Sequence, residues 1–215
     1  MITEPDLQLL QCSWQRSFAS YQTNNHSYNQ ALFEKLLESY SEPQRKYHTL
    51  QHLIECIQKF ELVIDLVASP REIEVALWFH DAIYDVQGHD NEALSAKWAK
   101  ESLVAVGASM DEIDRIYHLI MVTQHTNIPH SLDEQTLVDI DLSILGERSE
   151  RFKEYDIQVR QEYAWVPEEI YLIKRCEVLE MFLARSFIYS TAYFQNHFEV
   201  HARENLAHSI TQLKR

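Results

Sequence analysis

Apolar residues recur at three- and four-residue intervals along nearly all of the 215-residue chain. This spacing places them on one face of a helix, and the long apolar-polar alternation that indicates β-strands does not occur. The pattern therefore predicts an all-α protein. No stretch rich in Pro, Gly or Ser divides the chain and its length suits one substantial core, so we expect a single domain over residues 1–215.

The periodic segments define the expected helices. They cover approximately residues 5–21, 28–40, 53–67, 69–85, 90–106 and 109–123, with further helices after Ser149. Capping residues such as Ser109 support several of the starts, and Gly107 ends one helix.

The stretch from Ser69 to Asp85 is the most informative part of the chain. Ser69 is expected to cap its helix, Pro70 suits the first helical position, and Glu72 completes a capping box with Ser69. The apolar stripe of this helix is expected to contain Ile73, Ala76, Leu77, His80 and Tyr84.

An imidazole and a carboxylate thus enter a region of Leu, Ile, Trp and Phe, because His80 lies on the stripe and Asp81 borders it. A buried carboxylate is costly unless it is neutralised, paired or bound to a cation. The structural alternative is that His80 bonds a backbone carbonyl and Asp81 pairs with an Arg.

Two other stretches carry the same kinds of side chain. His48 and His52 are four residues apart and share a helix face, so they can reach a common ion or one another. The alternative is two interfacial histidines that cap a helix start. In residues 137–146, Asp139 and Asp141 lie among large aliphatic residues, which directs an acid into apolar packing unless both face water.

Composition narrows the possible partners and compartments. The chain has 19 Lys and Arg against 33 Asp and Glu, a net charge of −14 without a basic run, which disfavours a nucleic-acid duplex as partner. Three isolated glycines exclude a glycine-rich phosphate loop, and three widely separated cysteines indicate reduced cytosol. Without a signal-peptide pattern or a long apolar run, we expect a cytoplasmic protein that does not enter the membrane.

His52, the adjacent pair His80-Asp81 and Asp141 follow the order His, His-Asp, Asp along separate helical segments. This order resembles the HD superfamily of metal-dependent phosphohydrolases, and the chain looks most like a bacterial group of predicted HD phosphohydrolases. The resemblance implies an all-α, single-domain HD-type bundle with the metal site in its core. The motif-bearing core would cover about residues 28–210, with a helix in residues 1–27 packed on it. The implied metal ligands are His52, His80, Asp81 and Asp141.

Two shorter elements extend the resemblance. The stretch from Tyr47 to His52 looks like the Tyr-His-x-x-x-His element of cyclic-nucleotide phosphodiesterases, which implies that His52 binds metal and that His48 protonates the leaving oxygen. The stretch from His80 to Asp85 is similar to the His-Asp-x-x-Glu-Asp element of guanosine-tetraphosphate hydrolases, with Tyr84 in place of the Glu.

Two imidazoles and two carboxylates suit a divalent ion such as Mn²⁺, Fe²⁺, Co²⁺ or Zn²⁺ better than Mg²⁺. Such an ion lowers the pKa of a bound water, which is the expected nucleophile. Asp85 could accept its proton or bind a second ion, and His48 could act as the general acid. His125 and Glu92 are candidate substrate contacts, although Glu92 also suits the first turn of a helix.

The predicted function is a metal-dependent phosphomono- or diesterase that hydrolyses a small nucleotide-like phosphate ester, and a homodimer is compatible with the sequence. Two alternatives stay open. One is a metal- and nucleotide-binding sensor without turnover on the same scaffold. The other is an HD-type iron oxygenase, which needs further histidines for a second iron, such as His118, His125 and His130.

Overall fold

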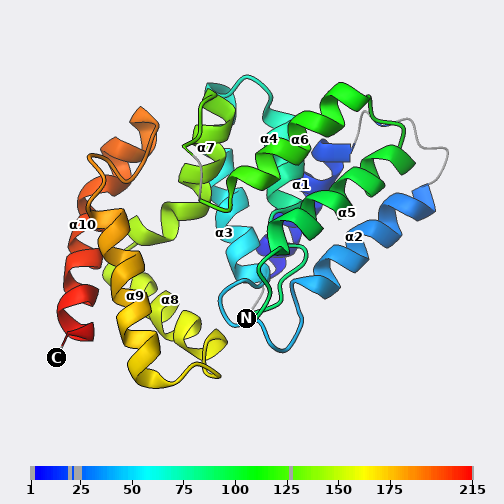
Figure 1. Ribbon diagram of the computed structural model, residues 1–215. Coiled ribbons are helices and arrows are strands. Elements are labelled where there is room, and N and C mark those ends of the chain that lie inside the picture. Colours follow the sequence, from blue (N-terminus) through cyan, green and yellow to red (C-terminus); the bar gives the residue numbers. More distant parts are fainter. Residues whose placement is uncertain (1–2, 19–20, 22–25, 126–127, 215) are drawn as a thin grey trace. The chain divides into compact units, whose positions relative to one another are not determined.

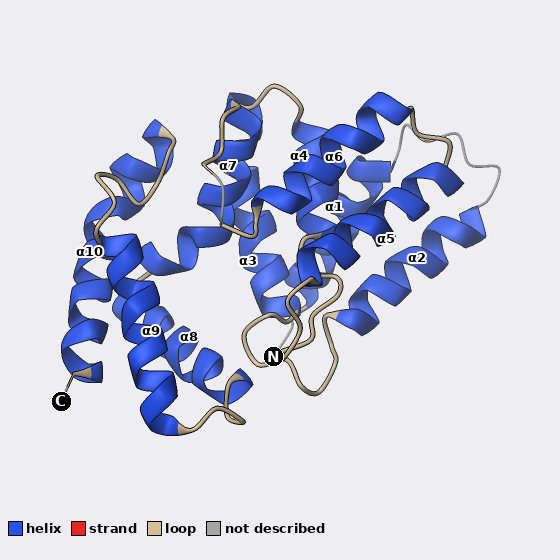
Figure 2. Cartoon of the chain, in the orientation of Figure 1, coloured by secondary structure: helices blue, strands red, loops and turns tan. Residues whose placement is uncertain are grey.

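A computed structural model describes residues 3–18, 21, 26–125 and 128–214. Within these ranges the regular structure is entirely helical, which confirms the predicted all-α class (Figure 2). The elements are α1 (Glu4–Phe18), α2 (His26–Ser39), α3 (Leu50–Glu61), η1 (Ile64–Leu66), α4 (Pro70–Phe79), α5 (Asn91–Ala105), α6 (Met110–Val122), α7 (Leu132–Asp141), η2 (Leu142–Gly146), α8 (Ser149–Glu162), α9 (Glu168–Leu183) and α10 (Ala192–Leu213).

The chain divides into two compact units, Met1–Val138 and Asp139–Arg215. The division falls inside α7, so this helix begins in the first unit and ends in the second. A single domain over the whole chain stays a prediction. Of the helices that the structure describes, none combines the length and apolarity needed to cross a membrane.

Helix α4 is the centre of the first unit (Figure 1). It packs against α1, α3, α5 and α6, and every residue from Glu72 to Phe79 is buried. The expected stripe residues Ile73, Ala76, Leu77 and His80 are buried as predicted, but the other faces of this helix are buried as well, and Tyr84 lies beyond its end. Its two buried acids are compensated by arginines: Glu72 pairs with Arg115 at 2.6 Å, and Glu74 pairs with Arg16.

The start of α4 differs from the predicted capping box. Pro70 occupies the first turn as expected, but the Ser69 side chain makes no capping hydrogen bond. The carboxylate of Asp133 instead accepts the N–H groups of Ala68 at 2.8 Å and Ser69 at 3.0 Å. Asp133 lies in the first turn of α7, so a side chain 64 residues away from Ser69 replaces the local cap.

In the second unit, α10 packs against α8, α9 and η2. The segment directly before α10 is held by Asp139, whose carboxylate accepts the N–H of Ser190 at 2.8 Å and both the N–H and the hydroxyl of Thr191 at 2.7 Å. Asp139 is fully buried, so it does not face water. The close approach of η2 to α10 requires a glycine, because a Cβ on Gly146 would lie 2.6 Å from the carbonyl oxygen of Phe198.

Candidate metal centre

The C-terminus of α4 carries His80 and Asp81. An ending helix exposes four backbone carbonyls, which must find donors if they are buried. Here the His80 N–H bonds the Ala76 carbonyl at 2.8 Å, and His80 Nδ1 bonds the Leu77 carbonyl at 2.8 Å. The other two carbonyls also find donors: the Tyr40 hydroxyl, from 38 residues earlier in the chain, bonds Trp78 O at 3.3 Å, and the Ala82 N–H bonds Phe79 O at 3.0 Å.

This termination explains why the helix is shorter than predicted. The expected helix continues to Asp85, but α4 ends at Phe79 and His80 is its C-terminal cap. Asp85 is therefore not one helical turn beyond Asp81. It lies in the loop before α5, where its N–H bonds the Asn91 side chain at 2.9 Å and its carboxylate accepts the Gln87 N–H at 2.9 Å.

The backbone that follows α4 is held by Arg45, a residue that the sequence prediction left without a role. Its guanidinium is buried and donates to the carbonyl of Asp81 at 2.6 Å and that of Ala82 at 3.0 Å. It also donates to the His48 carbonyl at 3.2 Å. Arg45 thus ties the segment before α3 to the segment after α4. No spacing rule in a single sequence identifies such a long-range contact.

His52 reaches the same place from α3. The hydroxyl of Thr49 caps this helix by accepting the Gln51 N–H at 3.3 Å, so His52 lies in its first turn. His52 and His80 are both almost completely buried, with 2% and 1% of their surfaces exposed. The amphipathic pattern of α3 therefore carries one imidazole into the core beside the end of α4.

Three potential ligand atoms converge there. The Nε2 atoms of His52 and His80 are 3.1 Å apart, and Asp81 Oδ2 lies 3.4 Å from His52 Nε2 and 3.1 Å from His80 Nε2. Metal bonds of about 2.1 Å place neighbouring ligand atoms about 3.0 Å apart at right angles and about 3.4 Å apart at tetrahedral angles. The observed triangle therefore has the dimensions of one face of a coordination sphere.

The chemistry of these atoms also favours a cation. A carbonyl only accepts, so His80 Nδ1 must carry a hydrogen toward Leu77 O, and neutral His80 presents a lone pair at Nε2. That lone pair faces a carboxylate oxygen of Asp81 at 3.1 Å, a repulsive arrangement unless a positive charge intervenes. One proton can satisfy one pair of these atoms, whereas a divalent cation satisfies all three.

Asp81 is available as an anionic ligand. Burial raises the pKa of its carboxyl, but when the imidazoles are protonated, the charges of His80 and His48 and the hydrogen bonds from His52 and His80 outweigh burial. Together they hold the pKa of Asp81 well below its usual range. The carboxyl is accordingly ionised at neutral pH.

His48 lies beside this triangle and is half-buried. Its ring stacks on Tyr84 at 4.1 Å between centroids, and its centroid is 5.9 Å from that of His52. The ring of Tyr47 contacts both histidines, with its centroid 4.8 Å from that of His52 and 4.9 Å from that of His48. Tyr84 therefore fixes the orientation of the imidazole of the predicted general acid.

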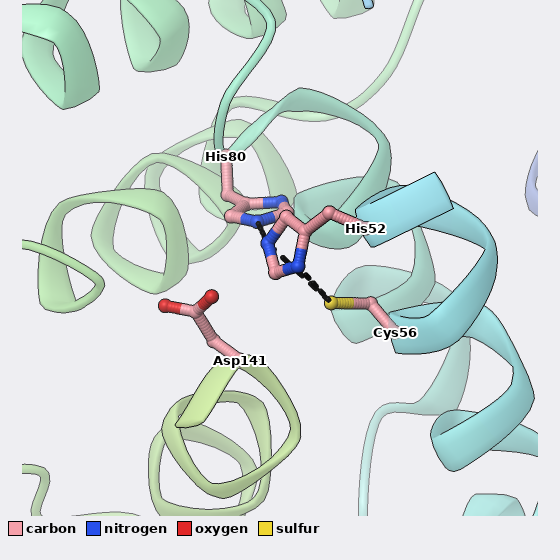
Figure 3. A group of neighbouring side chains, drawn as sticks. All are labelled: His52, Cys56, His80 and Asp141. Atoms are coloured by element: carbon pink, nitrogen blue, oxygen red, sulfur yellow. Dashed lines mark hydrogen bonds between the residues drawn. The ribbon is translucent and has the colours of Figure 1, made fainter. Parts of the chain in front are cut away.

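Cys56 is a neighbour that the sequence prediction missed. It lies one helical turn after His52 on the buried face of α3, and its Sγ is 3.7 Å from both ring nitrogens of His52 (Figure 3). The ligand atoms that Cys56, His52 and His80 offer lie within 4.8 Å of one another. In the sequence, Cys56 could have been identified from its spacing of four residues from His52, which places both side chains on one helix face. All three cysteines of the chain are free thiols.

Asp141, also drawn in Figure 3, is the last residue of α7 and belongs to the second unit. Its side chain is half-buried, whereas Asp139, two residues earlier, bonds the backbone directly before α10. Asp139 therefore has a structural role, and Asp141 remains the candidate ligand of this stretch.

The two proposed substrate contacts lie on separate segments. Glu92 is half-buried in the first turn of α5. His125 follows α6 with a positive φ of 56°, a left-handed conformation that is uncommon outside glycine. His118 and His130, which an iron oxygenase would need, are exposed on α6 and before α7. The structure does not favour them as ligands buried in the core.

Comparisons of the chain with family models, with curated proteins and with solved structures gave no significant match.

Proposed function

We propose that this protein is a metal-dependent phosphohydrolase that acts on a small, nucleotide-like phosphate ester. The observation that carries the proposal is the triangle of His52 Nε2, His80 Nε2 and Asp81 Oδ2, with edges of 3.1 to 3.4 Å. The match of these residues to the order His, His-Asp gives independent support, because the resemblance uses sequence and the triangle uses geometry.

Asp141 is the proposed fourth ligand. This choice rests on the resemblance, in which Asp141 takes the last place in the order His, His-Asp, Asp. Its half-buried carboxylate is not used to bond the segment before α10, whereas that of Asp139 is.

The donor set favours some metals over others. Two imidazoles and two carboxylates form a mixed nitrogen and oxygen set, which suits Mn²⁺, Fe²⁺, Co²⁺ or Zn²⁺. Two carboxylates also balance the charge of a divalent ion. When bound, such an ion would polarise a phosphoryl oxygen and lower the pKa of a water ligand.

His48 is the proposed general acid. It is half-buried, so its ring can face both the ligand triangle and entering substrate, and stacking on Tyr84 fixes the orientation of the ring. Protonation of the leaving oxygen by a positioned side chain is worth about 10²- to 10⁴-fold in rate. Asp85 is the weaker candidate for a base, because its exposed carboxylate already closes a turn with Gln87.

The negative charge of the chain limits how substrate is recognised. With a net charge of −14, an anionic phosphate needs local positive charge, which a divalent ion at the triangle would supply. The nucleotide part of the proposal rests on the likeness of the stretch from Tyr47 to His52 to cyclic-nucleotide phosphodiesterases.

The test is phosphate or nucleoside release from a panel of nucleoside mono-, di- and cyclic phosphates with Mn²⁺, Co²⁺ or Mg²⁺. We expect turnover by the wild type and its loss in His80→Ala. His48→Gln should lower turnover by about 10²-fold or more while metal stays bound. Thermal stabilisation by a nucleotide without any product would contradict the hydrolase and identify a sensor.

A further inference from the structure

A cavity of about 640 Å³ lies between α8 and α10, entirely within the second unit. Four residues of its lining form what we call the floor: Phe152 and Asp156 from α8, and Asn205 and Ser209 from α10. Phe152, Asn205 and Ser209 are buried, and Asp156 is half-buried. Cavities of this size hold small molecules, and none of the floor residues belongs to the proposed metal centre.

Asn205 presents a hydrogen-bond acceptor to this cavity. Only 8% of its surface is exposed, and its Nδ2 donates to the carbonyl of Leu145 at 2.9 Å and to that of Glu147 at 2.8 Å. Because a carbonyl only accepts, these two bonds fix the orientation of the amide and use both of its hydrogens. Its Oδ1 accepts no hydrogen bond from the residues that the structure describes. This oxygen therefore needs a donor from outside the chain.

The other two polar side chains of the floor also present acceptors. The hydroxyl of Ser209 uses its only hydrogen to bond Asp156 Oδ2 at 2.7 Å, and Asp156 Oδ1 accepts from Arg175 at 2.6 Å. Ser209 lies one turn after Asn205, so the two residues share a face of α10. The polar side chains of the floor thus offer amide, hydroxyl and carboxylate oxygens, and their own hydrogens are already used.

Arg175 holds the floor in place without a ligand. It is a buried residue of α9, and its guanidinium lies 4.9 Å from the centroid of the Tyr155 ring. The carboxylate of Asp156 is therefore held from two sides, by Arg175 and by Ser209. A site whose polar groups are already fixed loses less conformational entropy when a ligand binds.

We propose that the floor binds the ammonium group of a small organic amine. A primary ammonium carries three N–H donors and no acceptor, so it complements a surface that offers oxygens. The three acceptors are Asn205 Oδ1, Ser209 Oγ and the Asp156 carboxylate, and the bond to the carboxylate is charge-assisted. The apolar body of the amine would lie along Phe152 and Ile157, which line the same cavity. A metal ion would leave these apolar side chains and most of the volume unused.

The charges around the cavity favour a cation over an anion. Lys153 of α8 and Glu204 of α10 are exposed residues of its lining, and their opposite charges balance. The chain as a whole has a net charge of −14, which attracts cations. An anionic group at the floor would meet oxygen atoms without an intervening hydrogen, which is repulsive. The floor therefore selects a ligand that donates hydrogen bonds.

The first test is titration of the isotope-labelled full chain with 2-phenylethylamine, followed by NMR through the side-chain amide signals of Asn205. We expect saturable shifts of these signals with a Kd of about 1 mM or tighter. The trimethylammonium analogue keeps the charge but has no N–H group, and 2-phenylethanol keeps a donor but has no charge. Each of these probes should bind roughly tenfold or more weakly than the amine.

The second test locates the binding site with a matched pair of variants. Ile157→Arg places a guanidinium in the cavity, where it competes for the same oxygens and repels a second cation. Ile173→Arg is the control, since both isoleucines are 60% exposed and Ile173 lies on α9. We expect Ile157→Arg to weaken binding of 2-phenylethylamine by roughly tenfold or more, and Ile173→Arg to bind it like the wild type.

Three results would overturn the proposal. One is the absence of saturable shifts of the Asn205 signals up to about 10 mM amine, which would leave water as the occupant of the floor. Another is equal binding of the trimethylammonium analogue, which would show attraction by charge alone. The third is an Ile157→Arg chain that binds the amine as tightly as Ile173→Arg does, which would place the amine elsewhere. The titrations of the wild type decide the first two results even if Ile157→Arg does not fold.

Discussion

Arg45 donates a hydrogen bond of 2.6 Å from its guanidinium to the backbone carbonyl of Asp81. The same side chain bonds the carbonyls of Ala82 and His48, so one buried cation links the segments before α3 and after α4. The side chain of Asp81 then points to the two imidazoles while its backbone is fixed by Arg45. The geometry of the ligand triangle therefore depends on a residue that is not part of it.

Arg45→Ala should lower the free energy of unfolding by about 3 kcal/mol, because buried carbonyls lose their donors. It should also weaken metal binding roughly tenfold, as expected when a partner that orients a ligand is removed. Urea denaturation of metal-free protein and calorimetric metal titration measure the two effects. Lys46→Ala is the control, since the adjacent Lys46 is exposed and donates to the nearby Pro43 carbonyl.

Asp133→Ala tests whether the junction of α4 and α7 supports the site. Loss of its carboxylate leaves the N–H groups of Ala68 and Ser69 without their acceptor. If Asp141 is a ligand carried by α7, metal affinity should fall roughly tenfold although no triangle residue is changed. Asp65→Ala removes the same charge from an exposed position nearby and should bind metal like the wild type. Equal affinities for both variants would argue against the part assigned to Asp141.

Cys56→Ala should keep its metal. The sulfur is equally far from the two nitrogens of the His52 ring, 3.7 Å in each case, so it lies beside the ring and not in line with the Nε2 lone pair. We expect unchanged stoichiometry by elemental analysis and at most a severalfold change in affinity. If Cys56→Ala contained no metal, the ligand set would have to include the Cys56 thiolate, and zinc would then be favoured.

Gly146→Ala should strongly destabilise the second unit. The new Cβ would lie 2.6 Å from the Phe198 carbonyl oxygen and 2.7 Å from the Phe198 Cβ, both on the rigid helix α10. A loss of about 3 kcal/mol or more is expected from such overpacking of backbone against backbone. At Gly107 an added Cβ meets nothing within 4 Å, and only its φ of +80° opposes Ala. Gly107→Ala should therefore cost about 1 kcal/mol in a denaturant melt.

Much of the fold follows from local patterns. Helical spacing predicts the all-α class and the approximate positions of α1, α2, α5 and α6. Helix ends were harder to predict where contacts with residues distant in the sequence determine them. The expected helix to Val67 ends at Glu61 and is followed by the short η1, and α4 stops at Phe79 because donors such as Tyr40 satisfy its last carbonyls.

In the candidate site, too, some contacts could be predicted from the sequence and others depend on residues that are distant in the sequence. The resemblance implied that His52 lies near His80 and Asp81, and their ring nitrogens and carboxylate oxygen do meet at 3.1 to 3.4 Å. The roles of Arg45 and Asp133 could not be predicted, because each acts on backbone groups more than 30 residues away. Patterns of apolar spacing carry no information about such contacts.

The most direct measurement is calorimetric titration of chelator-treated protein with Mn²⁺ or Co²⁺. The account predicts one ion bound per chain by the wild type and by His118→Ala, which removes an exposed histidine of α6. It predicts no comparable binding by His80→Ala or Asp81→Ala. A wild-type chain that binds no divalent ion, or triangle variants that bind as well as His118→Ala, would contradict it.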